Sequence, residues 1–230
     1  MSIKKNISII VEDYINRHNN INSNFWDWFG QSKVIDENGD PIICYHGTPK
    51  GGFTKFIPSS GQKKRIAKKQ IDFGTHFTKD REYAVSYMGD KKTSKVYEVF
   101  LKIENPLHLN KMIYKDDEYF EQYLGAMEQL SKSRKKKIKG DYYYDRDGNK
   151  HPDIQFAIIT NFEFDELPVY KMYNILINWG FDGIFYQPYN SVNLNYFKVH
   201  PQSYVVLNPN QIKATTNDGT WDIDDDDIYS

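Results

Sequence analysis

The spacing of apolar residues along the chain alternates between the helical period and the strand period. Residues 6–17 carry apolar side chains on one stripe, which predicts an amphipathic helix within an N-terminal segment, residues 1–24. Helical spacing returns in residues 111–141 and in residues 170–179, where Gly180 supplies a left-handed cap. These three segments are therefore expected to be the main helices.

Shorter apolar runs between these segments predict strands. Residues 33–35 and 42–45 flank a turn-forming Asp-Glu-Asn-Gly-Asp sequence and predict a hairpin, whereas residues 154–162 fit a strand or a helix. Further strands are predicted at residues 73–78, 96–103, 107–109, 181–186 and 204–207, with a short helix over residues 80–88. No repeat or linker interrupts the pattern, which predicts one mixed α+β domain over residues 1–230 with a helical insertion at residues 111–168.

The composition excludes several classes of protein. The chain is 39% hydrophobic and 16% aromatic, too apolar for a disordered protein, and its net charge of −1 gives no general attraction to nucleic acid or membrane. The single cysteine, Cys44, excludes an internal disulfide and is expected to be a small buried residue. No signal peptide or membrane-spanning segment is found, so we expect a cytoplasmic protein, with delivery into a host cell left open.

Charge is concentrated in three local runs. A basic cluster at residues 63–69 is either a solvated loop or a contact for an anionic ligand, and a second at residues 132–139 is typical of a solvated helix end. The acidic segment at residues 221–230 lacks the spacing of a calcium loop and is interpreted as a solvated tail. The scattered histidines provide no metal-ligand spacing, so no metal site is predicted.

Two short motifs carry the candidate chemistry. A strand ends in His46-Gly47-Thr48, and about thirty residues later Gly74-Thr75-His76-Phe77-Thr78 precedes Ala84 and Tyr87 at helical spacing. A glycine beside an imidazole, together with an aromatic residue on a short helix, predicts a cleft for a planar ligand that carries ribose. The alternatives are a strand histidine bonded to backbone, a core tyrosine and a glycine that only forms a turn.

Taken in order, these motifs resemble ADP-ribosyltransferases of the diphtheria-toxin and poly(ADP-ribose) polymerase branch, and most closely the type found in phage and mobile-element polyvalent proteins. The resemblance runs from about Phe25 to the C-terminus and leaves the central insertion unmatched. Besides the two motifs, it rests on Trp28-Phe29-Gly30, Ser32-Lys33-Val34, Asn105-Pro106-Leu107, Gly180-Phe181-Asp182-Gly183-Ile184, Tyr204-Val205-Val206, Pro209-Asn210-Gln211-Ile212-Lys213-Ala214 and Asn217-Asp218-Gly219-Thr220.

The resemblance implies a split β-sandwich, in which two small antiparallel sheets surround a cleft for NAD, the substrate. It implies that His46 bonds the adenosine-side ribose, that the Gly47 backbone pairs with the nicotinamide carboxamide, and that Tyr87 stacks on the nicotinamide ring. The acceptor of ADP-ribose would be a protein or a nucleic acid, in a conflict between phage or mobile element and host. The remaining residues implied to line this cleft are Thr48, Gly74, His76, Phe77 and Ala84.

Two positions depart from the family pattern. His76 stands where active members usually carry tyrosine, and we expect its imidazole to be neutral if the cationic nicotinamide binds beside it. Ser203, preceded by Gln202, stands where the family carries its catalytic glutamate. Ser203 and Gln202 are the expected catalytic candidates on the acceptor side, although neither can offset a ribosyl cation as a carboxylate does.

Three functions therefore remain open on the sequence alone. The first is ADP-ribosyl transfer, with a carboxylate borrowed from Glu163, Asp165 or Glu166 as one possible remedy for the missing glutamate. The second is a catalytically silent module that binds NAD, nucleic acid or a protein partner. The third is NAD hydrolysis, in which water replaces the macromolecular acceptor. The acceptor and the oligomeric state are not predicted.

Overall fold

The computed structural model describes residues 22–57, 74–109, 111–133, 143–144, 150–151, 156–159, 169–187 and 201–230. The predicted helix at residues 6–17 lies outside these ranges, as do the basic cluster at residues 63–69 and most of the run at residues 132–139. The carboxylates of Glu163, Asp165 and Glu166 also lie outside them.

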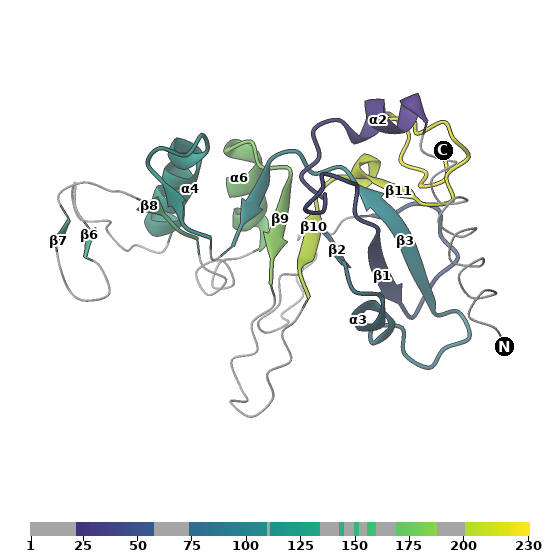
Figure 1. The fold of residues 1–230 in the computed structure, drawn as a ribbon. Coiled ribbons are helices and arrows are strands. Elements are labelled where there is room, and N and C mark those ends of the chain that lie inside the picture. The colour runs from purple at the N-terminus through teal and green to yellow at the C-terminus, as the bar shows by residue number, and fades with distance from the viewer. Residues whose placement is uncertain are drawn as a thin grey trace, which may run out of the picture.

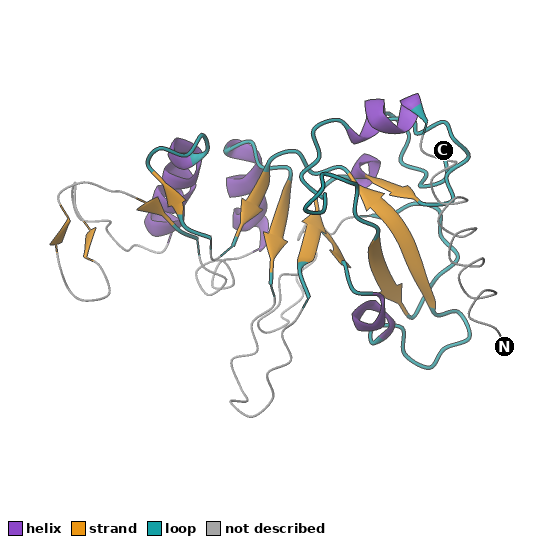
Figure 2. Cartoon of the chain, viewed as in Figure 1, coloured by secondary structure: helices purple, strands orange, loops and turns teal. Residues whose placement is uncertain are grey.

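The centre of the fold is a curled seven-stranded sheet (Figures 1 and 2). Its strands follow the order β11-β3-β1-β2-β10-β9-β4, and every neighbouring pair is antiparallel except β4 with β9. The predicted α+β class is confirmed. The strands are β1 (Cys44–Thr48), β2 (Thr75–Thr78), β3 (Lys95–Leu101), β4 (Pro106–His108), β9 (Gly183–Tyr186), β10 (Ser203–Val206) and β11 (Ile212–Ala214).

The sheet consists of two halves that meet at one narrow point. β1 pairs with β3 along its whole length, and β2 pairs with β10 along its whole length. Between β1 and β2, however, the register contains only Tyr45 opposite Thr78. The two small sheets expected from the sequence are thus joined into one, and the two strands that carry the candidate motifs separate just beyond that pair.

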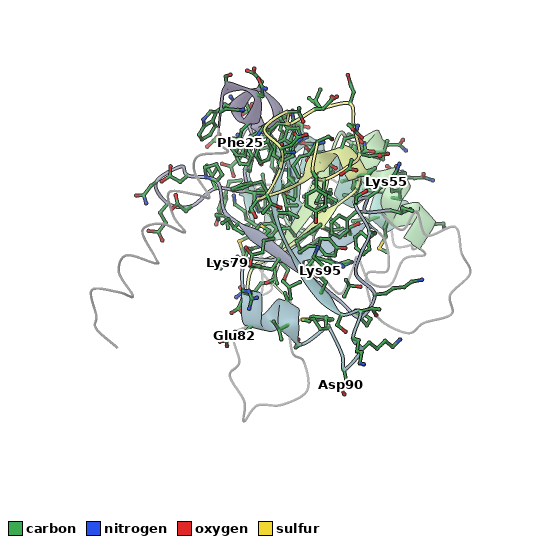
Figure 3. All side chains as sticks on the ribbon, turned by 90° about the vertical axis from the view of Figure 1, so that its right-hand side faces the viewer. Phe25, Lys55, Lys79, Glu82, Asp90 and Lys95 are labelled. Atoms are coloured by element: carbon green, nitrogen blue, oxygen red, sulfur yellow. The ribbon has the colours of Figure 1, made fainter. Side chains whose placement is uncertain are left out.

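The helices are α2 (Ser23–Phe29), α3 (Arg81–Val85), α4 (Phe120–Ser133) and α6 (Val169–Asn178). Asp80 begins α3, since its carboxylate accepts from the Tyr83 N–H at 2.8 Å. Figures 1 and 3 show α2, with Phe25, and α3, with Glu82, at opposite ends of the β1–β3 pair.

The two faces of the sheet are covered differently. On the helix-bearing face, α2 packs beside Ile43 and Phe100, α3 packs on Gly47, and α4 and α6 pack beside Ile184 and Val205. On the loop-covered face, the core is closed by side chains of connecting segments. That second core contains Val34, Cys44, Phe56, Phe77, Tyr97, Val99, Leu101, Ile103, Tyr204, Val206, Ile212, Ala214 and Ile228.

Two predicted elements require correction, and one open alternative is decided. The helix predicted over residues 111–141 is wrong for residues 111–119, because β5 (Ile113–Tyr114) pairs there with β8 (Phe156–Ala157) and a turn follows. Residues 154–162 accordingly contribute a strand. The hairpin predicted for residues 33–45 is reduced to a bridge between Ile35 and Pro41, since proline offers no N–H to a ladder. Two further short strands, β6 (Tyr143–Tyr144) and β7 (Lys150–His151), also pair.

The acidic C-terminal segment is part of the core, so its interpretation as a solvated tail is wrong. Trp221 and Ile228 are buried, and the Ile228 N–H donates to the Thr54 carbonyl at 2.8 Å. The buried Lys213 ammonium donates to the carbonyls of Asp225 and Asp227 at 3.0 and 2.9 Å. The carboxylates on this segment therefore lie near a buried cation, whose positive charge offsets part of their negative charge. The net charge of the chain does not reveal this arrangement.

Candidate functional site

His46 is held in the narrow junction between β1 and β2. Its Nδ1 donates to the His76 carbonyl at 2.7 Å, close to where a continued backbone ladder would have lain. The ring contacts Phe56 and Phe77, with centroids 5.1 and 5.5 Å away. Burial lowers the pKa of His46, although the bond to the carbonyl opposes that shift. The imidazole is therefore neutral near pH 7, and its Nε2 is an acceptor.

Gly47 has a packing role that the sequence did not indicate. A Cβ at this position would lie 1.7 Å from the Ala84 carbonyl oxygen, so only glycine allows α3 to rest on β1. Ala84 is itself buried beneath this contact. The adjacent Thr48 hydroxyl accepts from the Lys50 N–H at 3.2 Å. The His-Gly-Thr motif thus both forms a strand end and provides the surface on which α3, the helix that precedes Tyr87, packs.

His76 projects from β2 onto the helix-bearing face and bonds a residue that the sequence analysis did not select. Its Nδ1 lies 2.9 Å from the Tyr186 hydroxyl, and the two rings are perpendicular. Tyr186 is the last residue of β9, on the far side of β10 from β2. Gly74, before β2, has a φ of +71°, and a Cβ there would lie 2.4 Å from Val205 Cγ1. Its conformation allows the start of β2 to lie close to its neighbouring strand β10.

The short helix α3 and the turn after it contribute a pair of tyrosines rather than one. The hydroxyls of Tyr83 and Tyr87 lie 3.0 Å apart, and Tyr87 is 57% exposed. Burial, followed by the bond to Tyr87 and an electrostatic interaction with Tyr186, raises the pKa of Tyr83, so its phenol keeps its proton. Tyr83 therefore links the exposed ring of Tyr87 to the His76–Tyr186 pair. We call His76, Tyr83, Tyr87 and Tyr186 the His/Tyr cluster.

Ser203, which the sequence resemblance places at the position of the family's glutamate, lies beside this cluster. Ser203 opens β10, is 3% exposed, and stands opposite Thr78 and Tyr186 in the two ladders. Its hydroxyl donates to the Pro201 carbonyl at 3.2 Å. The Gln202 amide donates to the carbonyls of Tyr186 and Ser203 at 3.1 and 3.2 Å. The donors of both predicted acceptor-side residues are thus bonded to backbone.

The structure brings together only part of the predicted site. The helix-bearing side holds His76, Ser203, Ala84 of α3 and Tyr87 of the turn after α3, and Gly47 also faces it. The side chains of His46, Thr48 and Phe77 alternate onto the loop-covered face. Sequence reasoning missed Tyr83 and Tyr186. The spacing of Tyr83, four residues before Tyr87, was a usable signal, whereas the approach of Tyr186 to His76 depends on strand order.

Other features of the described ranges lie apart from this cluster. A hollow between α4 and α6 is lined by Glu121, Gln122, Leu124, Gly125, Glu128, Asn178 and Trp179. Within the ranges that the structure covers, His, Cys, Asp and Glu side chains form no group of three or more that could hold a metal. No helix in those ranges combines the length and the apolar character needed to cross a membrane.

Comparison with protein families identifies one match. The model of the family described as "ADP-Ribosyltransferase in polyvalent proteins" matches residues 36–221, which is most of the chain and includes every residue of the His/Tyr cluster. Searches of curated proteins and of solved structures find no match.

Proposed function

This chain belongs to the ADP-ribosyltransferase family of polyvalent proteins, and we propose that it transfers ADP-ribose from NAD to a protein or nucleic acid. NAD is the substrate that this family uses. Because NAD is held inside cells, we propose a cytoplasmic site of action, in the chain's own cell or in a host during conflict with a phage or mobile element.

The observation that carries this proposal is the separation of β1 from β2 beside the His/Tyr cluster. Beyond Tyr45 the two strands no longer pair through their backbones, and we propose that ligand groups bind beside this junction on both faces of the sheet. On the helix-bearing face they would meet Tyr87 and His76, with Gly47 contributing backbone. On the loop-covered face, Nε2 of His46 is an acceptor suited to a ribose hydroxyl.

The chemistry expected at this site is departure of nicotinamide from an oxocarbenium-like ribose. Rigid positioning supplies much of the rate enhancement in such a reaction, and the docking of α3 on Gly47 fixes the backbone of the helix that precedes Tyr87. Tyr87 would stack on the nicotinamide ring while the His46 imidazole holds the adenosine-side ribose. Both contacts are proposals that bound NAD can test.

Incubation with NAD labelled in the adenylate half separates the candidate functions. Label retained on protein or nucleic acid after denaturing washes supports transfer, and free ADP-ribose with unlabelled macromolecules supports hydrolysis. His46→Ala is expected to abolish either activity, whereas Tyr114→Ala, which removes a comparably exposed tyrosine on β5, is expected to retain it. If wild-type protein consumes no NAD under conditions that support binding, the proposed transferase activity is wrong.

The second candidate is a module that binds NAD without turnover. It is favoured by Ser203, whose buried hydroxyl is bonded to the Pro201 carbonyl where the family carries a carboxylate. A binding isotherm for NAD, measured alongside the labelling experiment, distinguishes this candidate. Binding without consumption would support it, and turnover would exclude it.

A further inference from the structure

The position normally held by the glutamate is occupied by groups that are poorly placed to receive a proton. Ser203 is buried and the Gln202 amide donates to the carbonyls of Tyr186 and Ser203, so neither offers a basic atom. Cross-strand neighbours on one face of an antiparallel pair stand about 5 Å apart. Tyr186 is such a neighbour of Ser203, so its side chain begins beside the position where the resemblance places the family's glutamate.

The phenol of Tyr186 is bonded to a basic group. Its oxygen lies 2.9 Å from Nδ1 of His76; both side chains are partly exposed, and the Nε2 atom of His76 is buried. A neutral imidazole that donates Nδ1–H to a phenol oxygen keeps the lone pair on Nε2, and that atom can accept a proton. Position 76, where the resemblance expects a tyrosine, holds a histidine. This histidine therefore introduces a base beside the position of the missing glutamate.

We propose that His76 is the general base for the acceptor in this chain, with Tyr186 as the residue that positions its imidazole. This inference rests on the proposed transferase function. The C1′–N bond of NAD breaks and its electron pair leaves with nicotinamide, which becomes neutral. The acceptor X–H, a hydroxyl or amine, forms the C1′–X bond and gives its proton to His76. The imidazolium then donates Nδ1–H to the Tyr186 oxygen until solvent removes the proton.

The groups around the pair are compatible with this role. From α3, Tyr83 interacts with Tyr186 and keeps its proton because burial raises its pKa, and its hydroxyl lies 3.0 Å from that of Tyr87 in the turn after α3. From β1, the His46 imidazole donates to the His76 carbonyl and is neutral, because burial lowers its pKa. The charged groups nearby on α3 are engaged, since Asp80 caps the helix and Arg81 pairs with Glu98.

The test compares Tyr186→Phe with Tyr204→Phe across pH 5 to 9. Tyr204 lies on the same pair of strands as Tyr186 but points to the loop-covered face, so its variant removes a phenol hydroxyl without touching His76. For Tyr186→Phe we expect kcat to fall about tenfold to a hundredfold, with the KM for NAD changed less than about twofold. Tyr204→Phe is expected to remain within about twofold of wild type in both constants.

The pH profile separates positioning from simple structural support. A hydrogen bond from the imidazolium to Tyr186 stabilises the charged form, so its removal is expected to shift the acidic limb of the profile to lower pH. If Tyr186→Phe retains both the wild-type kcat and the wild-type profile, this inference is overturned while the transferase function stands. An unshifted profile with a general loss of activity also overturns it. If wild type consumes no NAD, the proposed function itself fails, and this inference with it.

Discussion

The two motif histidines, His46 and His76, lie on adjacent strands but on opposite faces of the sheet. His46 is enclosed by aromatic rings, and its Nδ1 secures the junction between β1 and β2. His76 instead faces a cluster of phenols and bonds Tyr186. The same side chain therefore serves as a structural donor in one place and as a candidate base in the other. The difference shows that residue type alone does not assign a role when strand alternation decides the surroundings.

The largest effect is expected for Gly47→Ala, which displaces α3, the helix that covers the site on the His76 face. The new methyl group would meet the Ala84 carbonyl, a backbone atom that cannot move aside by rotation. We expect the free energy of unfolding to fall by about 3 kcal/mol and NAD binding to be lost. Denaturant unfolding and calorimetry with NAD measure the two effects. Gly52→Ala is the control, because its Cβ has open space and only its positive φ costs about 1 kcal/mol. An undiminished stability for Gly47→Ala would contradict the packing role.

A smaller effect is expected when the junction loses its donor. His46→Ala leaves the His76 carbonyl without its imidazole partner and opens a void beside Phe56 and Phe77, for an expected loss of about 2 kcal/mol. His46→Asn keeps an N–H near the position of Nδ1 and is expected to recover about half of that loss. Chemical unfolding of both variants provides the measurement. Equal destabilisation by asparagine and alanine would mean that the hydrogen bond does not hold the junction.

Acid is expected to weaken the junction and the far end of the sheet by the same mechanism. Burial lowers the pKa of His46, and burial together with Lys111 lowers the pKa of His108 to about 4. The unfolded chain therefore binds protons that the folded chain excludes, and stability falls as pH decreases below about 6.5. For His108 the loss continues until about pH 4. Unfolding free energies measured between pH 7 and pH 4 should fall less steeply in His108→Asn than in wild type. Parallel curves would show that His108 does not contribute.

The smallest change in stability is expected for a variant of the exposed ring in the His/Tyr cluster. The same variant is expected to change NAD binding specifically. Tyr87→Ala removes a side chain that is 57% exposed, so the free energy of unfolding should change by less than about 0.5 kcal/mol. The loss of one stacking contact is expected to weaken NAD binding about tenfold. Tyr114→Ala, at 56% exposure on β5, is the matched control and should bind NAD as wild type does. Equal affinity in both variants would remove Tyr87 from the proposed site.

Much of the architecture could be predicted because local patterns and tertiary structure agree. Strands β2, β9 and β10 lie within or close to their predicted ranges, and Gly180 has the positive φ expected of a cap. The predictions were wrong where distant partners intervened. Residues 111–119 form a strand and a turn because β8 pairs with β5, and the acidic segment is packed because Lys213 bonds its carbonyls. The single-domain organisation stays a prediction.

The sequence by itself determined the α+β class and an order of motifs that indicated the family, and it predicts that a histidine and a serine stand where the family carries tyrosine and glutamate. Only the tertiary structure decided which of these residues lie next to one another. The order of strands brought Tyr186 to His76 across β10, and alternation turned His46 to the other face. The physical reason is that a side chain's neighbours across a sheet are set by pairing and register, which join residues far apart in the chain.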